Sequence, residues 1–237
     1  MAEAERESVT LQEVTHAGHT YSVVRVDTQR TKLRLYWNNP DGQHFGSLDN
    51  LKKWLEDRGE IMLFGTNAGM FRPDYAPCGL HIEEGRMLGK LNLRDGFGNF
   101  HLKPNGVFYL TEEGARVVVS ERFDAETSTV LLATQSGPML VIDGELHPAF
   151  KADSKHRNIR SGVGVVSPTE ICFVLSRDEV TFHEFGSLFR DALNCKNALY
   201  LDGVISSFCV PGKLEMPGFV PYAGMLAVTT PADKPAP

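Results

Sequence analysis

The chain has 237 residues, of which 42% are hydrophobic and 23% are charged. These fractions are typical of globular proteins and exclude a disordered, collagen-like or coiled-coil chain. The formal net charge of −6 argues against a general nucleic-acid binder, which is usually basic. Because no repeat or low-complexity linker divides the sequence, we expect one domain.

The first third of the chain predicts strands around one helix. Residues 20–26 and 32–37 are rich in Val, Leu and Tyr and alternate in polarity, which indicates two strands. Ser47 is expected to cap a helix that runs from residue 48 to about residue 57. Four apolar residues fall on one face of this helix: Leu48, Leu51, Trp54 and Leu55.

The middle of the chain predicts short strands joined by tight turns. Residues 60–64 indicate a buried strand, and residues 79–123 indicate a meander of hairpins. Its turns are expected where a glycine follows polar residues, at 83–85, 94–96, 104–106 and 112–114. Residues 129–133 and 139–142 predict two further strands, the second followed by a turn at 143–144.

The last third predicts a hairpin, a helix and two strands. The hairpin pairs residues 161–166 with 171–176, and the helix covers Ser187 to about Leu193. The strands are residues 198–201 and 224–229. The whole pattern predicts an α+β fold: a single domain with a mixed or mostly antiparallel β-sheet and a few flanking helices.

The two ends of the chain are expected to be disordered. We assign residues 1–15 to a disordered N-terminus, residues 16–229 to the domain and residues 230–237 to a disordered tail. The first eight residues hold three glutamates and no apolar core, so they are not a signal peptide. We expect a cytoplasmic protein, or an exported or periplasmic one if the natural N-terminus extends further. No apolar run approaches the roughly 18 residues of a membrane span.

Neither the cysteines nor the histidines predict a metal site. Four cysteines in a chain of this length do not form a disulfide scaffold, and none lies in a C-x-x-C pair. We expect buried free thiols, with a Cys195–Cys209 disulfide as the alternative in an oxidising compartment. The eight histidines are not spaced as metal ligands, and no Walker loop, G-x-S-x-G or H-E-x-x-H motif occurs. We therefore expect no metal and no cofactor.

Four segments share one design, in which a buried strand ends at a glycine turn that holds polar residues. Glycine lets a backbone approach a ligand closely, and a rigid strand can aim the polar side chains. Ordinary turn chemistry is the alternative for each segment, because Asn, Asp, Ser and Gly are common in turns. The segments are residues 65–71, 135–139, 157–162 and 201–207.

Residues 151–160 are locally basic in an acidic chain. They hold five cationic or titratable basic side chains against one carboxylate, Asp153. Such a segment can bind a phosphate or carboxylate, since arginine recognises both bidentately. A solvated charged loop is the alternative. The basic side chains are Lys151, Lys155, His156, Arg157 and Arg160.

Five motifs occur in an order that resembles the phosphodiester glycosidase family, in particular its compact bacterial members. The resemblance covers roughly residues 20–229. Two glycines of the family's L-D-G-G-G-S-S pattern are replaced, by Val204 and Ile205. The family's N-G-G-F-F pattern reads N-A-G-M-F here. The motifs are residues 67–71, 103–108, 135–141 with 143–144, 160–164, and 198–203 with 206–207.

The resemblance implies a hydrolase that cleaves the glycosidic bond of a sugar-1-phosphate diester. A phosphate monoester leaves with little need of a proton, so one carboxylate and one cation could suffice where ordinary glycosidases use two carboxylates. Asp202 would be the nucleophile or general base, Arg160 would hold the phosphate, and Asn67 would complete the catalytic set. The implied substrate-binding residues are Gly69, Phe71, Lys103, Gln135, Ser136, Gly137, Gly203, Ser206 and Ser207.

Within that set, Asn67 and Gln135 would bind sugar hydroxyls or phosphate oxygens. Gly69, Gly137 and Gly203 would offer backbone N–H groups to an anion. Asp202 as a residue that only caps its own turn is the alternative to its catalytic role.

Two other functions stay open at this point. One is a non-catalytic module that binds glycans or phosphoglycans on the same fold. The other is a metal-dependent phosphoesterase, which the scattered carboxylates and histidines disfavour. The expected partner is a phosphorylated carbohydrate, without nucleic acid or a membrane span, and the sequence leaves the oligomeric state open.

Overall fold

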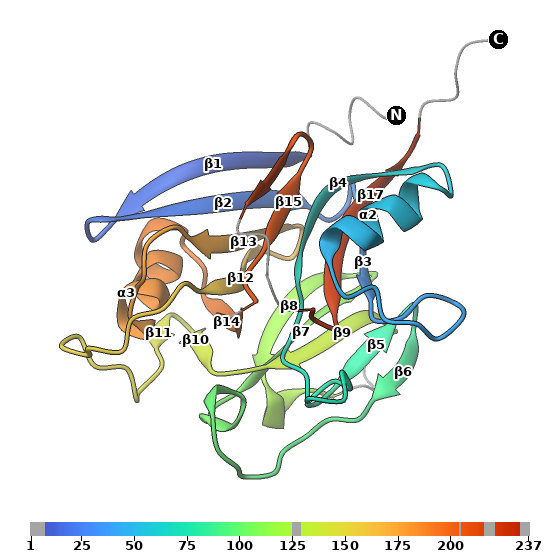
Figure 1. Ribbon diagram of the computed structural model, residues 1–237. Helices are drawn as coiled ribbons and strands as arrows, with labels where there is room; N and C mark the ends of the chain where they lie inside the picture. Colours follow the sequence, from blue (N-terminus) through green and yellow to red (C-terminus); the bar gives the residue numbers. More distant parts are fainter. Residues whose placement is uncertain (1–7, 125–128, 204, 216–220, 233–237) are drawn as a thin grey trace.

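Three antiparallel β-sheets make up the structure, a computed structural model of the chain (Figure 1). It describes residues 8–124, 129–203, 205–215 and 221–232. Every strand pairing in these ranges is antiparallel, and the helices are short. The predicted α+β fold with a mostly antiparallel sheet is therefore confirmed.

The first sheet has seven strands, and one of them ends at the candidate residue Asp202. Its centre is the hairpin that the sequence predicted around residues 167–169. In spatial order its strands are β1 (Val9–His16), β2 (His19–Asp27), β13 (Glu170–Ser176), β12 (Ser161–Ser167), β14 (Asn197–Asp202), β10 (Met139–Ile142) and β11 (Glu145–Leu146).

The other two sheets have five strands each. The second sheet is ordered β16 (Lys213–Glu215), β15 (Phe208–Val210), β4 (Glu60–Asn67), β17 (Met225–Pro231) and β3 (Lys32–Tyr36). The third sheet is ordered β6 (Arg86–Gly89), β5 (His81–Glu83), β9 (Val130–Ser136), β7 (Gly106–Thr111) and β8 (Gly114–Val119).

Helix α2 (Leu48–Glu56) forms as the sequence predicts. The Ser47 side chain accepts a hydrogen bond from the Asn50 N–H, which satisfies one free donor of the first turn. Leu48, Leu51 and Leu55 are buried against the second sheet. Apart from a second α-helix near residue 185, the other helical segments of the described residues are single turns: Asn99–His101, Ser120–Arg122 and a π-turn at Leu188–Ala192.

The second predicted helix is displaced toward the N-terminus. Helix α3 (Phe182–Ser187) begins after Thr181, whereas we expected the helix to start at Ser187. Thr181 and Glu184 form a capping box, in which each side chain bonds to the other's backbone N–H. Thr-x-x-Glu is thus the true start signal. The segment expected to be the helix forms the π-turn instead.

The N-terminus and one stretch of the meander also differ from expectation. Strand β1 pairs along its whole length with β2, so residues 9–15 are ordered; Val9 and Val14 pack against the core. Residues 1–7 and 233–237 of the expected disordered ends lie outside the described residues, and β17 extends to Pro231. The hairpins predicted with turns at 94–96 and 104–106 do not form. Residues 90–105 form a loop instead, which the Gln135 side chain holds by two hydrogen bonds to the Asn92 backbone.

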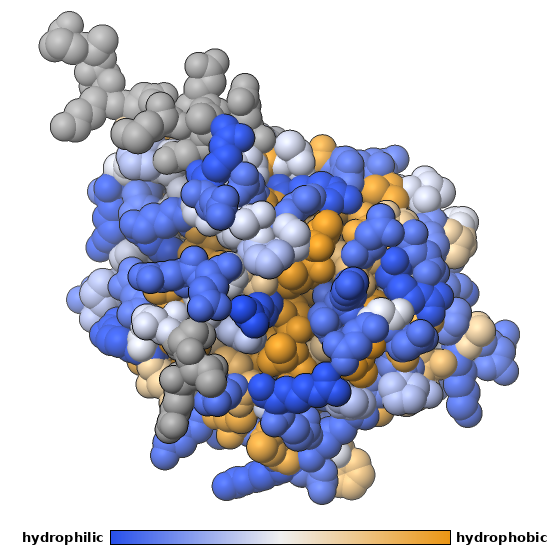
Figure 2. Space-filling model, turned by 180° about the vertical axis from the view of Figure 1, so that it is seen from behind, coloured by the Kyte–Doolittle hydropathy of each residue, from blue (hydrophilic) through white to orange (hydrophobic). Residues whose placement is uncertain are grey.

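Three phenylalanines join the sheets at their common core. Phe173 of the first sheet lies with its ring centre 5.0 Å from that of Phe64 in the second sheet and 6.1 Å from that of Phe108 in the third. All three side chains are fully buried. Apolar side chains also reach the surface in a band across the face opposite to that of Figure 1 (Figure 2).

All four cysteines are free thiols, as expected, and the structure does not support the alternative of a Cys195–Cys209 disulfide. Cys209 packs with the α2 helix, whereas Cys195 lies in another apolar cluster with its Sγ 3.4 Å from that of Cys172. Because the two thiols lie in different apolar clusters, this fold does not pair Cys195 with Cys209. No helix of the described residues is long and apolar enough to cross a membrane.

Candidate active site

Strand ends from two sheets meet at Asn67, the last residue of β4. The Asn67 side chain is fully buried, and its Nδ2 donates to the Ser161 hydroxyl at 3.0 Å. That hydroxyl lies 3.0 Å from the Asp202 carbonyl oxygen and donates to it. The Asn67 Oδ1 accepts from the Ser207 N–H at 3.4 Å. Asn67 thus ties β4, β12 and the turn after β14 into one unit, which makes it a positioning residue for Asp202.

Asp202 ends β14 and opens the turn that carries the candidate chemistry. Its backbone carbonyl accepts from the hydroxyls of Ser161 and Ser206, at 3.0 and 2.9 Å. One carboxylate oxygen, Oδ1, accepts from the Gly203 N–H at 2.6 Å. The turn-capping bond weighed from the sequence is therefore present. It fixes the orientation of the half-buried carboxylate, which is compatible with catalysis.

A β-bulge lies at this place. The pairing of β12 with β14 shifts register between Ser161 and Gly162, opposite Asp202 and Tyr200. Bulges re-aim side chains and are common beside active sites. The bulge thus helps set the direction in which the Asp202 side chain leaves the sheet.

Tyr200 is the nearest functional group that the sequence analysis did not single out. Its phenol interacts with the side chains of Arg160 and Asn99. Burial raises the pKa of Tyr200 well above its ordinary value, and the nearby Asp202 charge raises it further. Tyr200 therefore stays protonated and can donate a hydrogen bond. A Cβ at Gly203 would lie 2.6 Å from the Tyr200 oxygen, so glycine is what allows this approach.

Arg160 lies beneath the surface, whereas a side chain that binds a phosphate directly must be accessible to it. Its side chain is 2% exposed, with Nε donating to the Val180 carbonyl at 2.8 Å and Nη2 to the His156 carbonyl at 3.3 Å. The guanidinium lies 3.7 Å from the centre of the Phe182 ring. Burial lowers the pKa of Arg160, while Tyr200 opposes this. Arg160 is therefore placed to act through Tyr200 and the cleft wall.

A cleft of about 570 Å³ adjoins this group. Phe182 and His156, which contact Arg160, are part of its wall, and so is Asn99, which contacts Tyr200. Four basic side chains face one carboxylate here. The lining is Asn99, Leu102, Ala149, Phe150, Lys151, Asp153, Ser154, Lys155, His156, Phe182 and His183.

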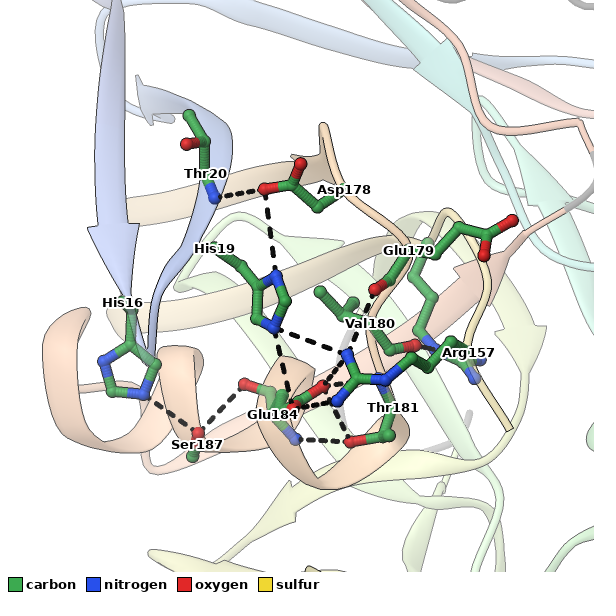
Figure 3. Close-up of polar contacts among 11 residues, drawn as sticks. His16, His19, Thr20, Arg157, Asp178, Glu179, Val180, Thr181, Glu184 and Ser187 are labelled. Atoms are coloured by element: carbon green, nitrogen blue, oxygen red, sulfur yellow. Dashed lines mark hydrogen bonds and ion pairs between the residues drawn. The ribbon is translucent and has the colours of Figure 1, made fainter. Parts of the chain in front are cut away.

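The basic segment thus divides into two parts. Lys151, Lys155 and His156 line the cleft and form no ion pair with another described residue. Arg157 instead points toward helix α3, where its guanidinium binds both oxygens of Glu184, at 2.6 and 2.9 Å (Figure 3). The predicted anion-binding segment therefore offers its lysines and His156 to a ligand, but not Arg157.

The contacts around Glu184 anchor the cleft loop to the β1–β2 hairpin. Burial alone would raise the pKa of Glu184, but the Thr181 N–H and Arg157 lower it to about 2. His19 lies 3.6 Å from Glu184 and 3.8 Å from Asp178 (Figure 3). This network holds Arg157 and, three residues on, Arg160 in place.

Several predicted ligand-binding residues have their polar groups occupied by the protein. Gln135 is buried, and its Oε1 accepts from the N–H groups of Leu80 and Asn92 while Nε2 donates to Asn92 and Ser120. Gln135 therefore holds the 90–105 loop. The Gly69 N–H donates to the Thr134 hydroxyl at 3.1 Å, so it does not face an anion.

The remaining predicted residues lie around the site in supporting positions. Ser136 is buried and donates to the Leu201 carbonyl at 2.9 Å, next to Asp202. Lys103 pairs with Asp95 at 2.8 Å and also donates to a loop carbonyl. Gly137 packs tightly on the Asn105 side chain and the Phe100 carbonyl. Phe71 stacks on Tyr75 at 5.7 Å. The structure thus brings together Asp202, Asn67, Gly203, Ser206 and Ser207, with Arg160 behind them.

The residues that sequence reasoning missed are Tyr200, Ser161 and Asn99. Tyr200 and Ser161 both stand inside motifs that the sequence analysis quoted, two residues before Asp202 and one after Arg160. Their spacing was a usable signal. Asn99 lies between β6 and β7, and no pattern in the sequence indicated it. The described residues contain no group of three or more His, Cys, Asp or Glu side chains that could hold a metal.

The comparison with known families places the chain. The model of the family described as phosphodiester glycosidase matches residues 62–229. The chain belongs to the phosphodiester glycosidase family, as the five motifs indicated.

Individual proteins are similar to this chain in sequence or in fold. YigE, an uncharacterized protein of Escherichia coli (strain K12), is 32% identical over 209 residues, which are 88% of this chain and 82% of YigE. The catalytic domain of zebrafish N-acetylglucosamine-1-phosphodiester alpha-N-acetylglucosaminidase, auto-inhibited by its pro-peptide, has the same fold, with a TM-score of 0.66 at 14% identity over 95% of this chain and 82% of that one. A hypothetical protein from Synechocystis also shares it, with a TM-score of 0.59 at 15% identity over 94% of this chain and 62% of that one.

Proposed function

We propose that the protein hydrolyses the glycosidic bond of a sugar-1-phosphate diester, with Asp202 as the catalytic carboxylate. The observation that carries this proposal is the position of Asp202. It is held by three hydrogen bonds at a glycine turn and lies near the protonated Tyr200, whose partner Asn99 lines the cationic cleft. Membership of a family of phosphodiester glycosidases supports the same reaction.

The proposed reaction breaks the bond between the anomeric carbon and the phosphate oxygen. Asp202 either attacks that carbon, forming a glycosyl ester that water then hydrolyses, or removes a proton from the water that attacks the carbon directly. The bonding electrons leave with the oxygen, and the departing phosphate monoester gains a second negative charge. A water oxygen ends on the sugar. No proton donor to the leaving group is required, which fits a site with one carboxylate at its centre.

The basic side chains are placed to stabilise the charge that develops on the phosphate. Lys151, Lys155 and His156 face the cleft, and fixed positive charge near a developing anion lowers the barrier. Tyr200 supplies a protonated phenol near Asp202, and one of its partners, Asn99, belongs to the cleft wall. Arg160 is proposed as a positioning residue that orients Tyr200 from below, which replaces the direct phosphate contact expected from the sequence.

The test is hydrolysis of sugar-1-phosphate diesters, including UDP-N-acetylglucosamine, in heavy-oxygen water. We expect the wild type to place the heavy oxygen in the sugar, and Asp202→Asn to lose at least about 1,000-fold in rate. Asp57→Asn, an exposed aspartate at the end of α2, is the matched control and should retain full activity. Substrate binding by Asp202→Asn should persist.

Three other outcomes would each reject the proposal. Heavy oxygen in the phosphate, with activity abolished by a chelator, indicates a metal-dependent phosphoesterase that cleaves the P–O bond. Binding of the diesters without any turnover by the wild type indicates a non-catalytic phosphoglycan module. Undiminished turnover by Asp202→Asn removes Asp202 from the reaction.

A further inference from the structure

Two of the four cysteines lie against each other on one face of the first sheet. The sulfurs of Cys172 and Cys195 are 3.4 Å apart, and the two residues are 0% and 2% exposed. Cys172 belongs to β13, whereas Cys195 follows the π-turn and precedes β14. The S–S distance of a disulfide is about 2 Å, so the two sulfurs need to approach by only about 1.4 Å to bond.

The contact between the two thiols depends on Gly164 of β12. Gly164 pairs with Cys172 on one side and with Ala198 of β14 on the other. A Cβ at position 164 would lie 2.6 Å from the Cys195 sulfur. Because glycine has no side chain, Cys195 can lie over β12 and reach Cys172.

The backbone on both sides of the contact is fixed by hydrogen bonds. The Cys195 N–H donates to the Phe189 carbonyl at 2.8 Å, and the carbonyl of the next residue, Lys196, accepts from the Gly144 N–H at 2.8 Å. Cys172 is held in register between β2 and β12. Groups that are fixed in this way lose little conformational freedom when a bond forms between them.

The remaining two cysteines lie elsewhere in the fold. Cys209 packs with helix α2, and Cys78 is half-buried in the segment between β4 and β5, where its N–H donates to the Met70 carbonyl at 3.0 Å. Cys172 and Cys195 share one apolar cluster, which includes neither of the other two. The native fold therefore favours one pairing of the four thiols.

The folded protein shields this pair from reagents in solution. The hydrogen bond with Cys195 and burial both raise the pKa of Cys172 well above its ordinary value. Because thiolates and not thiols attack disulfides, the folded pair reacts slowly with an external oxidant. In the unfolded chain both thiols are accessible and have a pKa of about 8.5. A bond between them can therefore form while the chain folds and is then buried.

We propose that Cys172 and Cys195 form a disulfide when the chain folds in the presence of a small disulfide oxidant such as oxidised glutathione. One cysteine thiolate attacks the oxidant, and a mixed disulfide forms as one glutathione thiolate leaves and takes up a proton. The second cysteine thiolate attacks the protein sulfur of the mixed disulfide and releases the other glutathione in the same way. Two protein thiols are oxidised, and one glutathione disulfide is reduced to two thiols.

This bond would staple three strands of the first sheet. Strand β12 lies between β13 and β14, so a bond from Cys172 to Cys195 spans it. Strand β14 carries Tyr200 and ends at Asp202, so the bond ties the strand of the candidate site to the middle of the sheet. It also joins residues 23 positions apart, which restricts the unfolded chain. The proposal does not depend on the reaction proposed above.

Refolding in a glutathione buffer tests the proposal. The full-length protein would be unfolded in urea with dithiothreitol and diluted either into reduced glutathione or into a mixture of reduced and oxidised glutathione. Material that has regained the native circular-dichroism spectrum would be denatured and alkylated, and its disulfides located by peptide mass. We expect a Cys172–Cys195 bond from the mixture and four alkylated thiols from the reduced buffer.

Burial and the cross-link each make a further prediction. Dithiothreitol should leave the bond intact in the native protein and reduce it once urea is added, whereas glutathione attached to Cys78 should be removed without urea. The cross-linked protein should have an unfolding equilibrium constant roughly 100-fold smaller than that of the reduced protein. Urea unfolding of the two forms measures this difference.

Variants isolate the pair. Cys78→Ser combined with Cys209→Ala leaves only the two proposed partners and should yield a protein with no free thiol. Cys172→Ala and Cys195→Ala, each added to that background, should keep one thiol or one glutathione adduct and show no gain in stability. Where refolding from urea is inefficient, the same exchange is run on native protein in urea below its unfolding midpoint, in which local opening exposes the pair.

Three results would overturn the proposal. The first is native protein from the oxidising mixture in which both Cys172 and Cys195 are alkylated. The second is a bond from either of them to Cys78 or Cys209. The third is a Cys172–Cys195 bond that occurs only in material without the native spectrum, because the bond would then be incompatible with the fold.

Discussion

The glycine at position 203 provides space that the site needs, and its backbone conformation is ordinary. Its φ is not in the left-handed region, so what requires glycine here is the close approach of neighbouring atoms. An added Cβ would lie 2.6 Å from the Tyr200 oxygen and 2.8 Å from the Ile159 carbonyl oxygen. Two elements that carry the site, β14 and the loop before β12, can therefore close on the turn only because residue 203 has no side chain.

Gly203→Ala should consequently impair the site more than it impairs the fold. We expect a destabilisation of about 1–3 kcal/mol, because the extra methyl is forced into a packed region. We also expect a fall in kcat of about 10- to 100-fold as Tyr200 is displaced. Urea unfolding and turnover of the diester substrate measure the two effects.

The double variant Tyr200→Phe, Gly203→Ala is the control, since it removes the oxygen that the methyl meets. Its loss of stability should be smaller than the sum of the two single losses. Strictly additive losses would contradict a direct contact between the two positions.

At the scale of elements, the charged network of Figure 3 attaches the cleft loop to helix α3 and to the β1–β2 hairpin. Its centre is Glu184, whose pKa is lowered to about 2 by the Thr181 N–H and Arg157 despite burial. A carboxyl group with a lowered folded-state pKa stabilises the fold above its ordinary pKa of 4.5. That contribution is lost as the pH falls from about 4.5 to about 2.

Glu184→Gln should remove this contribution while preserving the capping box, because glutamine can also cap. Near pH 7 we expect the variant to unfold with about 1–3 kcal/mol less free energy than the wild type. The difference should shrink as the pH is lowered toward about 2, where the wild-type carboxyl is protonated as well.

Urea unfolding at several pH values tests this. Glu56→Gln is the matched control, because Glu56 forms an exposed ion pair with Lys52 on α2 and should change stability by less than about 0.5 kcal/mol. A Glu184→Gln difference that stays constant with pH would show that the charge of Glu184 is not the cause.

At the scale of the whole molecule, the three sheets depend on one aromatic contact set. Phe64, Phe108 and Phe173 come from different sheets and meet at distances of 5.0 and 6.1 Å between ring centres. None of the sheets can bury its inner face without the others, so we expect the described part of the chain to unfold as one unit.

Phe173→Ala should lower the free energy of unfolding by about 3–5 kcal/mol, the usual range for removing a buried phenylalanine ring. Phe173→Leu, which keeps most of the volume, should cost clearly less. Tryptophan fluorescence reports on the second sheet and far-ultraviolet circular dichroism on all three. The two transitions should coincide in urea, and separate midpoints would mean that the sheets unfold independently.

The sequence was informative about structure that local chemistry dictates. The alternation in residues 161–176 and the Ser47 cap specified a hairpin and a helix that both form. The second helix was predicted from Ser187 to about Leu193, but Thr181 and Glu184 form two reciprocal capping bonds and start the helix at Phe182. Strand β1 was missed because its order comes from pairing with β2 and not from its own composition.

The sequence by itself determined the family and the antiparallel character of the fold, and it singled out the 201–207 turn as part of the candidate site. These follow from short motifs and from polarity patterns within a few residues. Only the tertiary structure decided which motif residues touch one another. It placed Asn67 and Ser161 on the Asp202 carbonyl, buried Arg160 beneath Phe182, and committed Gln135 to a loop.

The same limit explains why Tyr200 was missed. A polar side chain is equally suited to bind a ligand or another part of the chain, and its sequence neighbours do not distinguish the two. The choice depends on donors and acceptors that residues far along the chain bring within about 3 Å. The partners of Tyr200 come from positions 99 and 160. Such contacts are properties of the fold.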